Sequence, residues 1–266
     1  MSLFRYLPLI LIFGCSGGKE EASYDPDIAP PPPAPLISYS IIGQYPHDTG
    51  AYTQGLEFHN GKLFEGTGDY ENSSLRIVAP ESGEPDKLLK LKDPALFGEG
   101  ITIFEGKLYQ LTWQNNIAFV YDMKDLSKPA KKLDWPYEGW GITHNEKELI
   151  ISDGSANLYF TDPENLRVLK TVTVTENERP IDRLNELEYV NGAIFANIYT
   201  SNEIVKIDPA TGNLLGRMTF DNLLPREDIV PGRTDVLNGI AYDSSKDVFY
   251  ITGKRWPKMF TLKIAP

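Results

Sequence analysis

Pairs of short apolar strands separated by a turn recur along the chain, and this repetition is the clearest feature of its hydrophobic pattern. Five such segments align, at residues 55–68, 100–113, 141–154, 186–199 and 239–254. In each, an apolar run leads through a turn, such as Asn60-Gly61 or Glu105-Gly106, into a second run in which apolar residues alternate. Because this is the pattern of a β-hairpin, the sequence predicts an all-β protein.

The spacing of the five hairpins predicts a five-bladed β-propeller. Their starts lie 45, 41, 45 and 53 residues apart, close to the roughly 40–50 residues that a four-stranded blade occupies. A third short strand follows each hairpin, at residues 75–78, 118–121, 158–160, 204–207 and 259–262. A fourth follows in the first four repeats, for example at 88–91 and 168–174. The alternative is an irregular β-sandwich whose repeats are similar by accident.

The fifth repeat reaches the end of the sequence after its third strand, at Pro266. A strand-like segment at residues 36–45 precedes the first repeat and has no partner of its own. We therefore expect this N-terminal strand to be the fourth strand of the last blade. Closing the ring in this way leaves no open sheet edge, which is how propellers limit aggregation.

The first 14 residues are typical of a lipoprotein-type export signal. Arg5 precedes an apolar run from Tyr6 to Phe13, which is too short to span a bilayer as a mature helix. The run ends at Gly14-Cys15, which resembles the bacterial lipobox, although Phe13 stands where a small residue is usual. Cys15 is the only cysteine, so it cannot form an intramolecular disulfide. It is either the lipid attachment site or a chance thiol at the end of a signal peptide.

Residues 15–36 form a predicted tether between this signal and a folded domain at residues 37–266. A polar stretch at 16–27 is followed by a proline-rich run at 30–35, which should behave as a semi-rigid polyproline spacer. We therefore expect an exported protein of the cell envelope, in the periplasm or at the outer membrane. A lipid anchor would be its only contact with the membrane.

The composition narrows the classes of partner. The chain has 266 residues, 41% of them hydrophobic, which is enough for a real core. It carries 26 Lys and Arg against 37 Asp and Glu, a net charge of −11, and nucleic acid is therefore an improbable partner. The acidic balance suits a site for a cationic group such as an amine, or it is no more than a soluble acidic surface.

Equivalent positions of the repeats should meet at one mouth of the central channel, because the start of the first strand and the end of the second lie at the same rim of a hairpin. The residues before the first strands are Gln54, Glu99, Trp140, Asn185 and Asn238. Those at the ends of the second strands are Gly68, Trp113, Gly154, Tyr199 and Lys254. This mixture of one carboxylate, one ammonium, amides and aromatics suggests a chemical site. Each of these residues also has a purely structural interpretation. Glu99 and Lys254 could form a structural ion pair, and the aromatic residues could pack between blades. The glycines that follow these positions could be needed only for tight entry into a strand.

No other catalytic or metal-binding motif is apparent. The three histidines, His47, His59 and His144, are not spaced as metal ligands, and there is no HExxH, P-loop or GxGxxG sequence. Only one of the ten rim positions is acidic and none is His, which disfavours a metal-dependent propeller lyase or lactonase. No cofactor is expected; aspartates at turns leave a structural Ca²⁺ site possible but not deducible.

Six motifs in order resemble those of the plant and bacterial glutamine cyclotransferase family. They are residues 47–56, 97–100, 109–113, 138–141, 184–188 and 252–258, and the resemblance covers about residues 40–264. It implies a five-bladed propeller that converts the N-terminal glutamine of a peptide or protein into pyroglutamate, releasing ammonia without a zinc centre.

The resemblance also implies roles for individual residues. Glu99 matches the proposed acid/base carboxylate, and Lys254 and Asn185 are expected to assist it at the reacting oxygen. The residues that match or replace the family's other pocket residues are Tyr52, Gln54, Trp113, Trp140 and Tyr199. Tyr52 and Tyr199 stand where the plant enzymes have Phe and Trp, which bears on the width of the pocket. We expect a monomeric glutaminyl-peptide cyclotransferase; the alternative is a non-catalytic propeller that serves as a binding module of the envelope.

Overall fold

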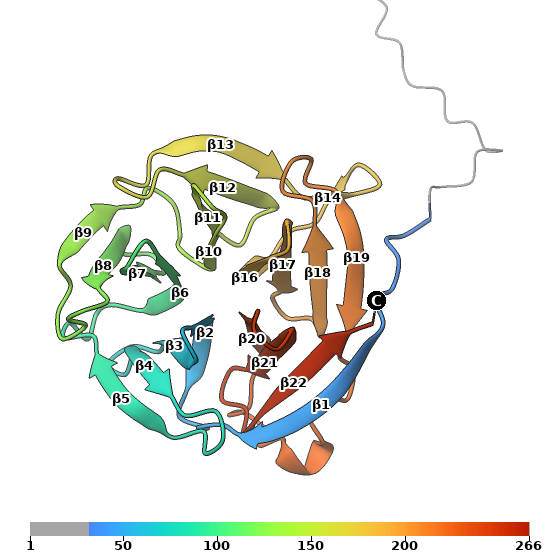
Figure 1. Cartoon of the computed structure of the whole chain (residues 1–266), viewed down its shortest axis with the longest axis horizontal. Helices are drawn as coiled ribbons and strands as arrows, with labels where there is room; N and C mark the ends of the chain where they lie inside the picture. The colour runs from blue at the N-terminus through green and yellow to red at the C-terminus, as the bar shows by residue number, and fades with distance from the viewer. Residues whose placement is uncertain (1–31, 266) are drawn as a thin grey trace, which may run out of the picture. The chain divides into compact units, whose positions relative to one another are not determined.

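The computed structural model describes residues 32–265, which contain 22 β-strands and one short 3-10 turn at Arg226–Asp228. Five antiparallel sheets of four strands stand around a common axis in the order of the sequence (Figure 1). The predicted five-bladed β-propeller is therefore confirmed. Each predicted hairpin forms the two inner strands of one blade.

The first four blades follow the sequence without interruption. The first contains β2 (Tyr52–His59), β3 (Lys62–Gly68), β4 (Ser74–Val78) and β5 (Pro85–Lys90). The second contains β6 (Gly98–Phe104), β7 (Lys107–Thr112), β8 (Ile117–Asp122) and β9 (Lys131–Asp134). The third contains β10 (Ile142–His144), β11 (Leu149–Ser152), β12 (Asn157–Thr161) and β13 (Val168–Thr173), and a small hairpin of β14 (Thr175–Glu176) and β15 (Arg179–Pro180) follows it. The fourth contains β16 (Leu184–Val190), β17 (Ala193–Ile198), β18 (Glu203–Ile207) and β19 (Leu214–Thr219).

The last blade combines strands from both ends of the described chain. It contains β20 (Leu237–Asp243), β21 (Val248–Gly253), β22 (Lys258–Ile264) and, on the outside, β1 (Tyr39–Pro46). β1 is antiparallel to β22, with Tyr39 opposite Ile264 and Pro46 opposite Lys258. Just before β1, the chain runs beside β19 of the neighbouring blade, where Ile37 N–H donates to the carbonyl of Arg217 at 2.8 Å. The N-terminal segment is therefore bonded to two adjacent blades.

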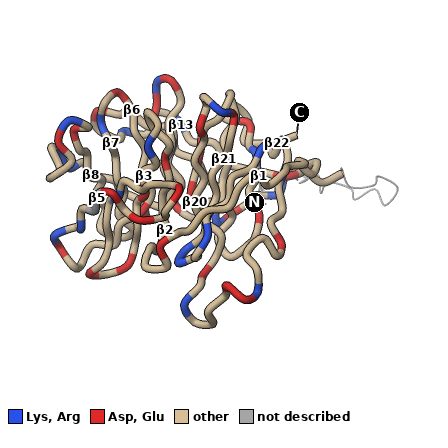
Figure 2. Tube along the Cα trace, turned by 60° about the horizontal axis from the view of Figure 1, so that its bottom comes forward, with Lys and Arg blue, Asp and Glu red and all other residues tan. Residues whose placement is uncertain are grey.

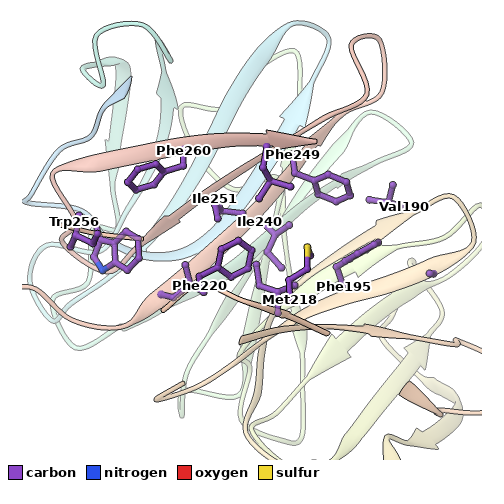
Figure 3. Packing of buried hydrophobic residues seen from close by; sticks show 14 residues of the cluster. Val190, Phe195, Met218, Phe220, Ile240, Phe249, Ile251, Trp256 and Phe260 are labelled. Atoms are coloured by element: carbon purple, nitrogen blue, oxygen red, sulfur yellow. The ribbon is translucent and has the colours of Figure 1, made fainter. Parts of the chain in front are cut away.

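The hydrophobic core lies between the blades, as Figure 3 shows for the fourth and fifth. Phe195 of β17 faces Phe249 of β21 with ring centroids 5.1 Å apart. Met218, Phe220 and Trp256 are buried in the same cluster. Burying a side chain of this size contributes about 1.5–3 kcal/mol, so neighbouring blades are held together mainly by apolar packing.

Glycines at the start of the repeats let the innermost strands approach closely. A Cβ at Gly100 would lie 2.7 Å from the carbonyl oxygen of Trp140, and Gly100 N–H donates to that oxygen at 2.8 Å. A Cβ at Gly55 would collide with the backbone of Ile101 in the same manner. The repeated glycine is therefore required by contact between blades, and it brings the rim residues of successive blades together.

Charged residues lie mostly on the loops at the two ends of the blades (Figure 2). Within residues 32–265 no helix is long and apolar enough to cross a membrane. The predicted export signal, the lipid attachment site at Cys15 and the first part of the tether, up to residue 31, lie outside the described residues.

Candidate active site

A pocket of about 230 Å³ opens at the end of the central channel where the inner strands of the blades begin. It is lined by Tyr52, Gln54, Phe97, Glu99, Trp113, Trp140, Asn185, Tyr199 and Lys254. The eight site residues that the sequence predicts for the propeller are thus brought together in one pocket. Phe97 was missed, although it begins one of the family motifs, because it lies outside the aligned hairpins.

Irregular backbone at the start of the inner strands explains why these side chains are at the rim. The pairing of β2 with β3 shifts register between Thr53 and Gly55, at Gln54. Equivalent shifts in the second, fourth and fifth blades span Glu99, Asn185 and Asn238. A β-bulge bends the strand and redirects a side chain, and bulges are common beside active sites. Four of the five positions picked out by the repeat therefore share one local backbone feature.

The side-chain amide of Gln54 bridges the acidic and basic groups of the pocket. Its nitrogen donates to Glu99 Oε1 at 3.2 Å, and its oxygen accepts from Lys254 Nζ at 2.7 Å. Glu99 is 4% exposed and Lys254 3% exposed, so both charges are sheltered from water. Glu99 and Lys254 are therefore linked through the amide of Gln54. They do not form the direct ion pair that the sequence left open as an alternative.

The environment moves the pKa values of this acid and base in opposite directions. Burial raises the pKa of Glu99 well above its usual range; Lys254 opposes the shift and Glu138 adds to it. Burial lowers the pKa of Lys254, while Glu99 and Asp235 oppose that change. The two pKa values are thereby shifted toward each other and toward neutral pH, as is typical of groups that exchange protons during catalysis.

Glu138 holds two aromatic walls of the pocket. Its Oε2 accepts hydrogen bonds from the indole nitrogens of both Trp113, at 2.8 Å, and Trp140, at 2.9 Å. Its Oε1 accepts from Gln114 at 2.8 Å. Burial alone would raise the pKa of Glu138, but the hydrogen bonds from Trp140, Gln114 and Trp113 outweigh it and lower that pKa, so the carboxylate is charged at neutral pH. The motif at residues 138–141 contains Glu138, but the repeat alignment assigned it no position at the rim.

The aromatic rings meet edge to face around the pocket. Trp140 and Tyr199 lie 5.5 Å apart at 85°, and Phe97 and Trp113 lie 5.7 Å apart at 64°. The ammonium of Lys254 lies 5.1 Å from the ring centroid of Tyr199, close enough for a cation–π interaction. These walls make the pocket apolar around a few polar groups, as ligand sites commonly are.

Two predicted rim glycines leave room for these rings. A Cβ at Gly154 would lie 2.6 Å from Trp140 Cζ2, and its φ of +81° also disfavours other residues. A Cβ at Gly68 would collide with the ring of Phe97. Both glycines therefore shape the pocket without lining it.

The two rim asparagines have different positions. Asn238 is buried behind the pocket, where its amide donates to the carbonyl of Thr53 at 3.0 Å and lies 3.5 Å from Gln54 Oε1. It supports Gln54 and does not line the pocket. Asn185 lines the pocket, and its buried side-chain oxygen has no hydrogen-bond partner among residues 32–265. That oxygen can therefore accept a hydrogen bond from a ligand.

No three His, Cys, Asp or Glu side chains among residues 32–265 come together as a metal site would require. The turn aspartates Asp48 and Asp69 are paired with arginines, and Asp153 accepts from Ser155 and Tyr159. The expectations about zinc, cofactors and calcium remain predictions.

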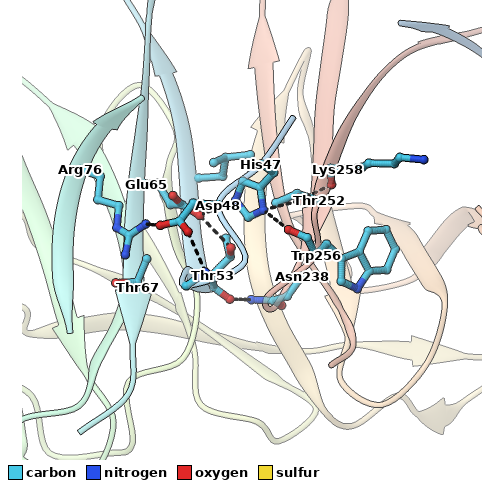
Figure 4. A network of polar contacts seen from close by, with 12 residues as sticks. His47, Asp48, Thr53, Glu65, Thr67, Arg76, Asn238, Thr252, Trp256 and Lys258 are labelled. Carbon is cyan, nitrogen blue, oxygen red and sulfur yellow. Dashed lines mark hydrogen bonds and ion pairs between the residues drawn. The ribbon is translucent and has the colours of Figure 1, made fainter. Parts of the chain in front are cut away.

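A buried ion pair beside the site ties the first blade to the last (Figure 4). His47 Nε2 donates to Glu65 Oε1 at 2.9 Å, and its Nδ1 lies 2.7 Å from the carbonyl oxygen of Trp256. Both partners are acceptors, so the ring is a doubly protonated imidazolium. His47 was considered only as a metal ligand from the sequence, and its structural role follows from contacts between distant segments.

Further along the channel lie three buried glutamates, Glu57, Glu186 and Glu188. Glu186 accepts from the backbone N–H groups of Leu56, at 3.1 Å, and Ile240, at 2.8 Å. Burial raises the pKa of Glu57 to about 8 and the pKa values of the other two well above their usual range. These carboxyl groups join inner strands of different blades through backbone hydrogen bonds.

The chain is similar to known proteins over most of its length. A family model described as glutamine cyclotransferase matches residues 10–264. An Arabidopsis thaliana protein named glutaminyl-peptide cyclotransferase is 40% identical over 227 residues, which are 84% of this chain and 70% of that protein. Among solved structures, the crystal structure of Myxococcus xanthus glutaminyl cyclase matches with a TM-score of 0.79 and 33% identity, covering 88% of this chain and 100% of that one.

Proposed function

The chain belongs to the glutamine cyclotransferase family, and on this premise we propose that its pocket converts N-terminal glutamine into pyroglutamate with Glu99 as the acid/base group. The observation that carries the assignment is the polarity of the Gln54 bridge. A carboxamide already lies in the pocket with its nitrogen at Glu99 and its oxygen at Lys254. A substrate carboxamide placed in that order has its leaving nitrogen beside the acid and its carbonyl oxygen beside the cation.

The reaction is an attack of the α-amine on the side-chain amide carbon of the same residue. The new C–N bond closes a five-membered lactam, and the bond to the amide nitrogen breaks to release ammonia. Because nucleophile and electrophile belong to one molecule, the protein supplies a folded conformer, proton transfer and charge stabilisation.

Glu99 can serve both proton transfers. A terminal amine has a pKa of about 7.7–8.0, so the substrate can arrive as an ammonium ion. Moving one proton from this ammonium to the Glu99 carboxylate gives a neutral, nucleophilic amine and a protonated acid, with no change in the total number of protons. In our proposal the carboxylate accepts a proton from the attacking nitrogen and gives one to the departing nitrogen. Transfer of this kind typically accelerates a reaction about 10²–10⁴-fold.

Lys254 and Asn185 are proposed to stabilise the oxygen that becomes negatively charged. Lys254 already donates to an amide oxygen in the pocket, and the side-chain NH2 group of Asn185, which lines the same pocket, would be the second donor. Tyr52, Trp113, Trp140 and Tyr199 would surround the aliphatic part of glutamine and exclude water, which strengthens each polar contact.

Release of ammonia from a Gln-initiated tripeptide, measured with the wild type and Glu99→Gln, tests the proposal. We expect turnover by the wild type and a loss of about 10²–10⁴-fold in kcat for the variant, with unchanged circular dichroism. The assay is repeated with EDTA, since the proposal requires no metal or other cofactor. Full activity of Glu99→Gln would remove Glu99 from the mechanism, and activity lost with EDTA would indicate a metal-dependent reaction.

The competing function is a non-catalytic binding module of the cell envelope. It predicts that Gln-initiated peptides bind, with quenching of the tryptophans in the pocket, but release no ammonia. Peptides that begin with Asn show whether the pocket can bind a carboxamide without cyclising it, because their shorter side chain cannot close the same five-membered ring.

For location, we propose export and attachment through a lipid on Cys15, with the propeller as a monomer. The support is the sequence alone: an apolar run that ends at the only cysteine, followed by a polar and proline-rich tether. Metabolic labelling with a fatty acid should mark the wild type and not Cys15→Ser, and labelling of both would contradict the assignment.

A further inference from the structure

A second cavity, of about 320 Å³, lies at the same rim of the first blade, and its lining is basic. Arg76, Lys90, Arg233 and Arg255 contribute to it, and Asp69 is its one acidic member. The chain as a whole has a net charge of −11, so this concentration of positive charge contrasts with the rest of the protein. Guanidinium groups in particular match the geometry of a carboxylate.

Two of the four basic groups are fixed by carboxylates. Arg76 is buried, and it donates from Nη1 to Asp48 at 2.6 Å (Figure 4). Its Nε donates to the hydroxyl of Ser74 at 2.9 Å. Arg255 donates to Asp69 at 2.8 Å. Both guanidinium groups are therefore held in place, and their charges are partly neutralised.

The other two basic groups have no carboxylate partner in residues 32–265. Arg233 Nη2 donates to the hydroxyl of Thr49 at 3.3 Å, and Lys90 Nζ donates to the amide oxygen of Asn72 at 3.3 Å. Both partners are neutral, so two positive charges in the cavity are available to a ligand.

The cavity adjoins the substrate pocket at Tyr52. The ring centroid of Tyr52 lies 4.8 Å from Lys254 Nζ, on the pocket side, and 5.3 Å from the guanidinium carbon of Arg255, which lines the cavity. Gly50, two residues before Tyr52, also lines the cavity. An extended peptide advances about 3.3–3.6 Å per residue. A peptide held by its first residue and leaving over Tyr52 therefore reaches the cavity with its second or third residue.

We infer that this cavity is a subsite for a carboxylate of the substrate, so that peptides with an acidic group just after the N-terminal glutamine are preferred. The inference rests on the proposed function, since it places glutamine in the pocket. The carboxylate can come from an Asp or Glu side chain or from the terminus of a short peptide. Arg233 and Lys90 contribute the charge, and Arg76 and Arg255 contribute fixed donors.

The test compares kcat/KM of the full-length protein on tripeptide amides that all begin with Gln. One set carries an acidic Glu at the second or third position, and the matched set carries a neutral Gln at the same position. Gln-Ala-Ala as a free acid and as an amide distinguishes a terminal carboxylate from a side chain. We expect acidic peptides to be favoured about fivefold to tenfold through a lower KM, since exposed charge pairs are individually weak. The preference should shrink at high salt.

The double variant Arg233→Ala/Lys90→Ala should reduce the ratio of acidic to neutral kcat/KM toward one. Lys62→Ala is the matched control, because Lys62 is an exposed lysine at the far end of the same blade, where it is the first residue of β3. Its ratio should equal that of the wild type. A gain for the free acid alone would support the subsite with the terminal carboxylate as its occupant.

Equal kcat/KM for acidic and neutral peptides in the wild type would overturn the subsite and leave the cyclisation standing. An acidic preference that survives in the double variant would overturn it as well, because the preference would then arise elsewhere. No turnover of any peptide would overturn the proposed function, and the subsite with it.

Discussion

Lys254 donates from Nζ to the side-chain oxygen of Gln54 at 2.7 Å, and within residues 32–265 it forms no ion pair with a carboxylate. A buried lysine that faces an amide oxygen, and not a carboxylate, is placed to stabilise negative charge that develops on such an oxygen. Burial lowers its pKa, and Glu99 and Asp235 oppose that change.

Replacing Lys254 with methionine keeps the length of the side chain and removes its charge. We expect kcat to fall by roughly 10²–10³-fold, the effect of losing one good donor to an oxyanion, with a smaller change in KM. Steady-state kinetics of ammonia release measures both constants. A variant in which only KM rises would show that Lys254 binds the ground state and does not stabilise the transition state.

Trp140 is expected to act on binding. Its ring forms a wall of the pocket and meets Tyr199 at 5.5 Å, so Trp140→Ala removes apolar contact with the aliphatic part of glutamine. We expect KM to rise by about tenfold or more, because burial of a large side chain contributes roughly 1.5–3 kcal/mol, while kcat falls less. An unaltered KM would count against this role.

Glu138 is a positioning residue, since it touches the walls of the pocket and does not line it. Glu138→Ala leaves two partly buried indole N–H groups without their acceptor. We expect KM to rise about tenfold, toward the lower end of the roughly 1–3 kcal/mol that an unpaired buried donor costs. Glu138→Gln keeps one oxygen and should recover much of the loss. The intrinsic fluorescence of Trp113 and Trp140 should change in Glu138→Ala.

Gln114→Ala is the matched control for Glu138. It removes the third partner of the carboxylate but leaves both indole hydrogen bonds in place. We expect nearly wild-type KM and fluorescence. If Gln114→Ala and Glu138→Ala have equal effects, the carboxylate acts through general stability of the loop and not through the tryptophans.

The repeat predicted the part of the site that recurs from blade to blade, the family motifs added Tyr52, and Glu138 and Phe97 were missed. Gln54, Glu99 and Asn185 occupy equivalent bulges, so aligning the hairpins was enough to bring them to one rim. Glu138 and Phe97 lie in loops outside the aligned segments, where no periodicity determines the direction of a side chain. Their roles became visible only once the blades were placed side by side.

Contacts between segments that are far apart in the chain could not be predicted from the sequence either. The imidazolium of His47 is held by Glu65, from the first blade, and by the backbone of Trp256, from the last. Spacing along the chain gives no sign of such a pair, because 18 residues separate His47 from Glu65 and 209 separate it from Trp256. The fold was predictable from local patterns, whereas the polar links between its first and last blades depend on how the ring closes.

The His47–Glu65 pair predicts how stability depends on pH. Burial opposes the charge of His47, but Glu65 and the Trp256 carbonyl outweigh it and raise its pKa above 6.5. Burial likewise opposes the charge of Glu65, but His47 outweighs it and lowers the pKa of Glu65 below 4.5. The contribution of His47 is complete below pH 6.5 and is lost as pH rises through its folded pKa. That of Glu65 is complete above pH 4.5 and is lost as pH falls through its folded pKa.

The pair should therefore stabilise the protein most between about pH 4.5 and 6.5, and Glu65→Gln should cost most in that window. We expect a loss of about 3 kcal/mol at pH 5.5, because removing one member of a buried pair leaves the other charge uncompensated. Urea unfolding of the wild type and the variant at pH 5.5 and pH 9 measures the difference. Glu164→Gln, which breaks the exposed pair with Lys107, is the control and should have no measurable effect. A Glu65→Gln penalty that is the same at both pH values would show that His47 is not charged in the folded protein, since the loss would then come from packing and the hydrogen bond of Thr53 alone.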